Sequence, residues 1–145
     1  MIPLLATSLC IVFCFLGLLH FYWAAGGKWA LADAMTPKMW AAMMKPGKQT
    51  GFRVLTVFVG FGLLAMGGIM LSNWLGGLPD FLEPFLKWVT LGVSGVFTVR
   101  AIGNFKDVGL FQGGTSSEFA RRDKRIYSPL CIVLAVGAFV LWWMG

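Results

Sequence analysis

Polar and ionisable side chains lie close to one end of each long apolar stretch of this sequence. His20, the single histidine, precedes Tyr22 and Trp23 near the end of the first stretch. The remaining members of this set begin or end the other three stretches: Arg53, Thr98, Arg100, Asn104, Asp123 and Tyr127. Imidazole exchanges protons near neutral pH, a guanidinium pairs with anions, and aromatic rings stack on flat groups. Together these residue types could bind or act on a molecule with a polar head and an apolar tail.

Four long apolar stretches would have to position these side chains. Hydrophobic residues make up 58% of the 145 residues and charged residues 12%, about half the charged share of an ordinary soluble domain. A helix crosses the hydrocarbon core of a bilayer with about 20 residues. Stretches of that length lie at about residues 2–25, 52–75, 81–103 and 127–144. The sequence therefore predicts an all-α fold, a single four-transmembrane-helix bundle over residues 1–145 with two structured cytoplasmic loops. We expect the first stretch to be a retained helix, because no cation precedes it and it is long for a signal peptide.

The distribution of cations predicts how the four helices are oriented. Five lie in or beside the first loop and six in or beside the third: Lys28, Lys38, Lys45, Lys48 and Arg53, and Arg100, Lys106, Arg121, Arg122, Lys124 and Arg125. Only Lys87 remains for the opposite side. Because Lys and Arg accumulate in cytoplasmic loops, we expect a bacterial inner-membrane protein with both long loops cytoplasmic and both termini periplasmic. The net charge of +6 then fits contact with anionic lipids, and we expect no nucleic-acid partner.

Both long loops contain signals for short helices. Thr36 followed by Pro37 is typical of an N-cap with proline at the first helical position, and a Lys-Pro-Gly segment at 45–47 would end that helix. The segment 115–118, Thr-Ser-Ser-Glu, has the spacing of a capping box. Pro129 would remove a backbone hydrogen bond and bend the chain where it enters the fourth span.

The polar residues also have simpler structural interpretations. Arg53 and Arg100 could extend to the lipid headgroups and fix the depth of their helices, and His20 could be an interhelical hydrogen-bond partner. Hydroxyl groups at Thr90, Ser94 and Thr98 recur every four residues, which is more typical of a helix-packing face than of a ligand site.

Metal and cofactor chemistry has little support in the sequence. The three cysteines lie in apolar stretches without a CxxC pair or a zinc spacing, and one histidine cannot form a bis-histidine haem site within one chain. Met35, Met39 and Met43 could present thioethers to Cu(I), but a flexible apolar face explains them better. We therefore expect no metal site, and the sequence does not identify a cofactor.

Two groups of residues form an unusual combination. In the first half, His20-Phe21-Tyr22-Trp23 is followed by Gly26-Gly27 and then by Pro37. The second half contains Arg100, Gly103, Phe105, Lys106, Phe119-Ala120, Asp123 and Tyr127-Ser128-Pro129-Leu130-Cys131. Over nearly the whole chain, this combination resembles a bacterial four-helix membrane family, domain of unknown function 3995. The resemblance implies the four-span fold and its topology, and it implies no particular activity.

The leading functional hypothesis is a binding protein for an amphipathic molecule, an anionic lipid or a quinone. If the inner ends of the four helices come together, the polar residues form one pocket there. Arg53 and Arg100 would then meet the anionic or carbonyl end of the ligand, while His20, Trp23 and Tyr127 supply hydrogen bonds and stacking.

Three alternatives come from other functional classes. The protein could be a membrane enzyme acting on a lipid or quinone, with His20 as acid or base and Asp123 or Tyr127 as its partner. It could be a small transporter subunit that oligomerises, since four helices leave little room for a pore. It could also be a scaffold whose basic third loop docks a protein of a membrane complex.

Overall fold

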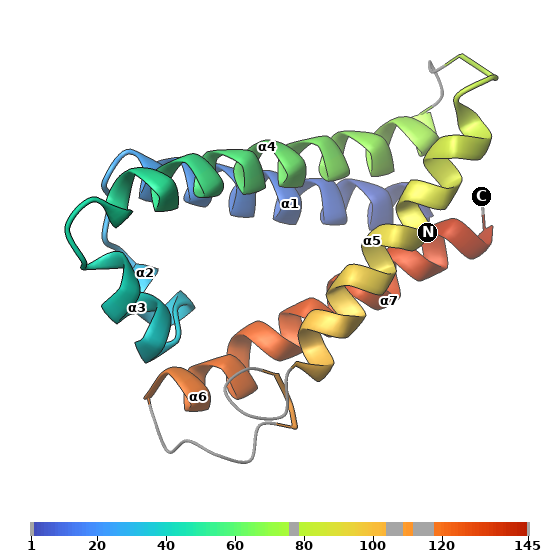
Figure 1. The fold of residues 1–145 in the computed structure, drawn as a ribbon. Helices are drawn as coiled ribbons and strands as arrows, with labels where there is room; N and C mark the ends of the chain where they lie inside the picture. Colours follow the sequence, from blue (N-terminus) through green and yellow to red (C-terminus); the bar gives the residue numbers. More distant parts are fainter. Residues whose placement is uncertain (1, 76–78, 104–108, 112–117, 145) are drawn as a thin grey trace.

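Helices contain most of the chain in the computed structural model, which describes residues 2–75, 79–103, 109–111 and 118–144 (Figure 1). The elements in chain order are α1 (Ile2–Ala24), α2 (Leu31–Ala34), α3 (Pro37–Met43), α4 (Lys48–Leu75), α5 (Glu83–Ile102), α6 (Glu118–Arg122), the π-helical turn η1 (Asp123–Tyr127) and α7 (Ser128–Met144). Within the described ranges, four helices are long and apolar enough to cross a membrane, the last running from Glu118 through η1 to Met144. The predicted all-α, four-span fold is confirmed.

Helix α4, the second of the four membrane-length helices, begins earlier than the apolar pattern indicated. Its first residue is Lys48, four residues before the predicted start of the span, whereas α5 lies within two residues of its predicted bounds. The side chains of Lys48, Gln49 and Thr50 are exposed, so this first turn projects beyond the apolar part of the helix. Hydropathy identifies the part of a helix that fits the hydrocarbon core of a bilayer. The helical backbone hydrogen bonds can continue beyond that part into water until a capping or helix-breaking residue ends them.

Glycines let α1 and α4 approach closely along their length. A β-carbon added to Gly17 would lie 3.0 Å from the carbonyl oxygen of Gly60, and one added to Gly67 would lie 3.3 Å from the carbonyl oxygen of Cys10. Gly60 and Gly67 are seven residues apart and so share one face of α4. Small residues at such a face allow backbones to pack against each other within a membrane.

The second helix pair, α5 and α7, is held by a side-chain hydrogen bond as well as by packing. The hydroxyl of Ser94 donates to the carbonyl of Ala135 at 2.8 Å, and both Ser94 and Thr90 are buried. Thr90 donates within its own helix to the carbonyl of Leu86 at 3.0 Å. The interpretation of the stripe as a helix-packing face therefore holds for Thr90 and Ser94, whereas the third member, Thr98, is exposed.

The two helix pairs meet at the end of the molecule that carries both termini, and they diverge toward the other end (Figure 1). At the junction, side chains from all four long helices form one core: Leu9, Phe13, Leu63, Met70, Val93, Leu134 and Ala138. A second cluster, formed by Trp23, Leu31 and Met35, lies at the opposite end of α1. We refer to that opposite end, which carries α2, α3 and α6, as the loop end.

Short helices occupy the loop end, as expected. Thr36 accepts a hydrogen bond from the backbone N–H of Met39 at 3.1 Å, which confirms the predicted N-cap of α3. The proposed capping box at 115–118 includes 115–117, which lie outside the described residues. Asp33 of α2 forms an ion pair with Arg122 of α6, so the first and third loops are joined.

A widened helical turn precedes Pro129. The backbone N–H of Ser128 donates to the carbonyl of Asp123, five residues earlier, which is the π-helical spacing. Proline has no N–H and its ring collides with the carbonyl four residues before it in a regular α-helix. The π turn relieves this conflict, so α6, η1 and α7 follow one another without a gap.

Candidate functional site

The structure places the predicted site residues on two different helix pairs. His20, Tyr22 and Trp23 belong to α1 and Arg53 to α4, at the loop end of the first pair. Thr98 and Arg100 belong to α5, and Asp123 and Tyr127 to η1, at the loop end of the second pair. Asn104 lies outside the described residues. The two groups thus lie on helix pairs that diverge toward the loop end (Figure 1).

Asp123 is the centre of the group on the second pair. Its side chain is fully buried, and its carboxylate accepts hydrogen bonds from the guanidinium Nη2 of Arg100 at 2.7 Å and from the backbone N–H of Gly109 at 2.7 Å. The hydroxyl of Ser128 donates to the same carboxylate at 3.3 Å. A buried carboxylate requires such partners, because removing an unpaired charge from water costs several kcal/mol. This arrangement ties the end of α5 and Gly109 to the π turn.

Arg100 is consequently not a free cation. Its Nη2 is paired with Asp123, and its Nη1 is buried and has no hydrogen-bond partner among the residues that the structure describes. The hydroxyl of Thr98 donates a hydrogen bond to the carbonyl oxygen of Ser94 at 2.8 Å, within the same helix. The group can hold the third loop in place, and it presents little unneutralised charge to an anion.

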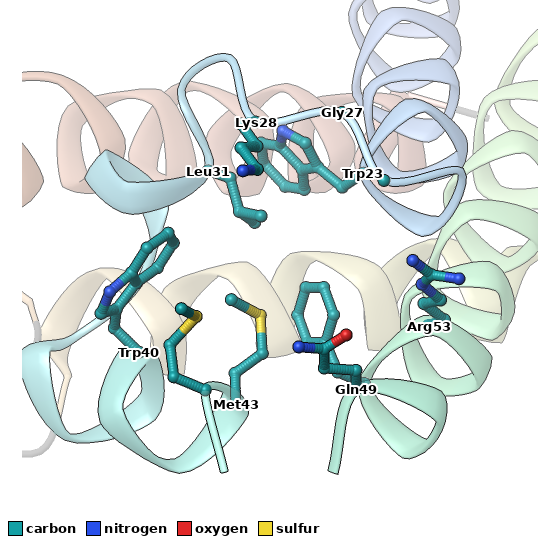
Figure 2. Close-up of a pocket in the computed structure, with 11 residues that line it drawn as sticks. Trp23, Gly27, Lys28, Leu31, Trp40, Met43, Gln49 and Arg53 are labelled. Carbon is teal, nitrogen blue, oxygen red and sulfur yellow. The ribbon is translucent and has the colours of Figure 1, made fainter. Parts of the chain in front are cut away.

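A pocket lies at the loop end of the first pair, between the end of α1, the chain that follows it, α3 and the start of α4 (Figure 2). Its volume is about 280 Å³. The lining residues are Trp23, Gly26, Gly27, Lys28, Leu31, Trp40, Met43, Met44, Gln49, Phe52 and Arg53. We call it the basic pocket, because its ionisable lining side chains are a lysine and an arginine.

Tight turns after α1 fold the chain back to form one wall of the basic pocket. Gly26 has a φ of +102°, a conformation that favours glycine. The ring of Tyr22 lies directly against Gly27, where any side chain would collide with it. The indole N–H of Trp23 donates to the carbonyl of Trp29 at 2.8 Å, and only 7% of Trp23 is exposed. Trp23 is thus a fixed part of the wall.

Lys28 and Arg53 supply the charge of the basic pocket. Figure 2 shows Lys28 beside Trp23, and Gln49 and Arg53 projecting from the first turns of α4. Among the described residues, no carboxylate lines the pocket and no ion pair joins Lys28 or Arg53 to another side chain. Arg53 therefore keeps its positive charge available, in contrast to Arg100.

His20 lies next to the basic pocket without entering its lining. Its Nδ1 is 2.7 Å from the carbonyl oxygen of Leu16, and its ring is 4.9 Å from that of Trp23. It lines a neighbouring cavity of about 160 Å³. The enzyme hypothesis required a hydrogen bond from His20 to Asp123 or Tyr127. Among the described residues none joins them, and Asp123 is satisfied by other groups.

Sequence reasoning missed two features of the loop end. Lys28 and Gln49 were not candidates, although Gly26-Gly27 directly before Lys28 signals the turn that returns it to the helix end. The ion pair between Asp33 and Arg122 was also missed. These two residues are far apart in the sequence, and no local pattern relates them.

No metal-binding group of three or more His, Cys, Asp and Glu side chains is found within the described ranges. Of the three methionines of the proposed thioether stripe, Met35 and Met39 line the smaller cavity and Met43 lines the basic pocket, so neither cavity is lined by all three.

The four apolar helices of membrane-spanning length define a polytopic α-helical membrane protein, and the basic pocket lies at its loop end. Residues 13–138 match the family described as "Protein of unknown function (DUF3995)", and the chain belongs to this family, as the resemblance indicated. No curated protein and no solved structure matches the chain.

Proposed function

We propose that the protein binds an amphipathic molecule with an anionic head group, an anionic membrane lipid, in the basic pocket. The observation that carries this proposal is that Lys28 and Arg53 line one cavity in which no carboxylate is found among the described lining residues. Two like charges repel in a partly apolar site unless an anion compensates them. Phosphate oxygens accept charge-assisted hydrogen bonds from both ammonium and guanidinium groups. A quinone has no negative charge, so the pocket favours a lipid over a quinone.

The size and lining of the pocket support a head group as its occupant. A volume of about 280 Å³ is just below the range of ordinary ligand pockets, about 300–1,000 Å³, and leaves no room for two acyl chains. Trp23, Trp40 and Phe52 add aromatic surface, which favours the boundary between headgroups and hydrocarbon. The chains of a bound lipid would therefore extend into the bilayer alongside the helices.

We propose further that the basic pocket faces the cytoplasm of a bacterial inner membrane. The bias of Lys and Arg toward the two loops supports this orientation. Single-cysteine variants K45C and D80C, in a background without native cysteines, test it with an impermeant maleimide. In cells with a permeabilised outer membrane, Cys at position 80 should react, and Cys at position 45 should react only after the inner membrane is broken. The reverse pattern would refute the orientation.

Native mass spectrometry of the gently solubilised protein tests the ligand proposal. Wild type should retain an anionic phospholipid, and the double variant K28Q/R53Q should retain about a tenth as much or less. The matched control is K45Q/K124Q, which removes two exposed cations outside the pocket lining and leaves the same net charge. Circular dichroism verifies that both variants are folded.

The control separates a site from general attraction between cations and anionic lipids. If K28Q/R53Q and K45Q/K124Q lose lipid equally, the bound lipid reflects net charge and the pocket has no special role. If neither loses it, the proposal is wrong. Retention of a neutral lipid with equal preference would also contradict an anionic ligand.

A further inference from the structure

The smaller cavity beside His20 adjoins the basic pocket on the side away from Lys28 and Arg53. The two share Trp23, Leu31 and Phe52 in their walls. Leu55, Thr56 and Val59 lie beyond Phe52 along α4, and His20 lies one turn before Trp23 on α1. None of the described residues in its lining is Asp, Glu, Lys or Arg. We call it the inner cavity, and it would receive the part of a ligand that follows the anionic group.

The hydrogen-bonding state of His20 follows from its contact with Leu16. A backbone carbonyl can only accept, so the 2.7 Å contact requires the proton on Nδ1. In the neutral imidazole the other nitrogen, Nε2, then has a lone pair and no proton. Among the described residues, Nε2 has no hydrogen-bond partner. His20 is therefore available as an acceptor.

The other polar side chains of the inner cavity, Thr56 and Trp23, likewise donate their hydrogen bonds to backbone carbonyls. The hydroxyl of Thr56 donates to the carbonyl of Phe52 at 2.7 Å, which leaves its oxygen able to accept. The indole N–H of Trp23 donates to the carbonyl of Trp29. With His20 in its neutral form, the described side chains of the cavity thus offer a ligand acceptors and no donor. A molecule that only accepts, such as an ester or a quinone carbonyl, gains nothing there, whereas a hydroxyl gains a partner.

The vertical spacing relates this hydroxyl to the anionic group. Thr56 lies three residues after Arg53, and His20 three before Trp23, which corresponds to about 4.5 Å along a helix axis. Both acceptors therefore lie about one helical turn from residues of the basic pocket, which favours a hydroxyl close to the anionic group over one far along the acyl chain.

We propose that the ligand is a single-chain anionic lipid with a free hydroxyl next to its phosphate ester, a lysophosphatidic-acid type of molecule, with the hydroxyl donating to His20 Nε2 or Thr56. This inference rests on the proposed function, because Lys28 and Arg53 hold the phosphate. It adds the requirement for a hydroxyl donor, which the basic pocket alone does not impose.

Two synthetic probes test the requirement. One is oleoyl-lysophosphatidic acid, and the other is its analogue in which hydrogen replaces the glycerol hydroxyl. Their affinities for the full-length protein in detergent are measured by competition with a fluorescent phospholipid. Wild type should bind the hydroxyl probe about three- to ten-fold more tightly, as expected for one neutral hydrogen bond. The comparison on wild type needs no substitution and so does not depend on the folding of a variant.

Variants at His20 and Thr56 show which of the two side chains accepts the hydrogen bond from the hydroxyl probe. H20F should lose most of the difference between the probes, and T56V, which is isosteric, shows any share of Thr56. Equal binding of both probes by wild type would overturn the hydroxyl requirement, and if K28Q/R53Q still weakened both, the proposed function would stand. If K28Q/R53Q changed neither affinity, the proposed function itself would fail. Inorganic phosphate as a third competitor distinguishes a lipid site from a free-phosphate site, since only a lipid site prefers the oleoyl probes by orders of magnitude.

Discussion

Arg100 and Asp123 form an ion pair of 2.7 Å that joins α5 to the π turn before α7, and the carboxylate of Asp123 is completely buried. The same carboxylate holds Gly109 through its backbone N–H. A cation at the end of a membrane helix, which in isolation indicates contact with lipid headgroups or a ligand, is here bound to the protein itself. The consequence for function is that Arg53, and not Arg100, carries the available charge.

Removing the carboxylate of Asp123 should destabilise the protein strongly. D123A leaves the guanidinium of Arg100 and the N–H of Gly109 without their acceptor, and breaking a buried pair costs about 3–5 kcal/mol. R100Q should cost at least as much, because it leaves the fully buried carboxylate of Asp123 without its cation, and the hydrogen bonds from Gly109 and Ser128 compensate that charge only in part. Unfolding by denaturant in detergent measures both changes.

The exposed ion pair partner Glu118 provides the control for this comparison. It contacts Arg121 at 3.3 Å and Arg122 at 3.5 Å, and its side chain is 67% exposed. E118Q should therefore change the free energy of unfolding by less than about 0.5 kcal/mol. If D123A were as mild as E118Q, the buried network would not have the structural role assigned to it.

The ion pair between Asp33 and Arg122 should keep the two loops together at the loop end. Each side chain is about two-fifths exposed, so its stabilising effect is small and weakened by salt, but it links α2 to α6 across the gap between the helix pairs. Spin labels at positions 32 and 125 report the separation. D33R should broaden and lengthen the distance distribution, and the charge swap D33R/R122D should restore it. If the distance distribution were the same in D33R, in D33R/R122D and in wild type, contacts other than this ion pair would hold the loops together.

Close approach of α1 and α4 should make Gly17 intolerant of substitution. A β-carbon there would lie 2.9 Å from Cγ of Leu64 and 3.0 Å from the carbonyl oxygen of Gly60, and backbone cannot move aside without separating the helices. We expect G17A to destabilise by about 1–3 kcal/mol in a thermal or denaturant unfolding assay. Gly62 is the matched control, since nothing lies within 4 Å of an added β-carbon. G62A should be neutral or stabilising, and equal losses at both positions would contradict the packing.

The fold was predictable because hydropathy and charge are properties of single segments. Apolar length located four spans, and Thr36 with Pro37 located the start of α3. The candidate site was predicted less well, since it depends on which segments become neighbours. The shared position of His20 and Arg53 near one end was visible, but the divergence of the helix pairs, which separates them from Asp123 and Tyr127, was not. The ion pair between Arg100 and Asp123 could not be predicted either. The π turn changes the direction in which the residues before α7 point, and no pattern of apolar residues indicates such a turn.

The π turn also leads to an unusual expectation for Pro129. A proline in the interior of a regular helix costs about 3 kcal/mol, so replacing it normally stabilises. Here the widened turn over Asp123–Tyr127 already accommodates the ring, and the buried contacts of Asp123 fix that turn. P129A should therefore change the free energy of unfolding by less than about 1 kcal/mol. V133P, placed one turn later in the regular part of α7 at an exposed position, should cost about 3 kcal/mol or more. Thermal unfolding in detergent compares the two. A stabilisation of about 3 kcal/mol by P129A would mean that the proline strains the helix and that the π turn does not relieve it.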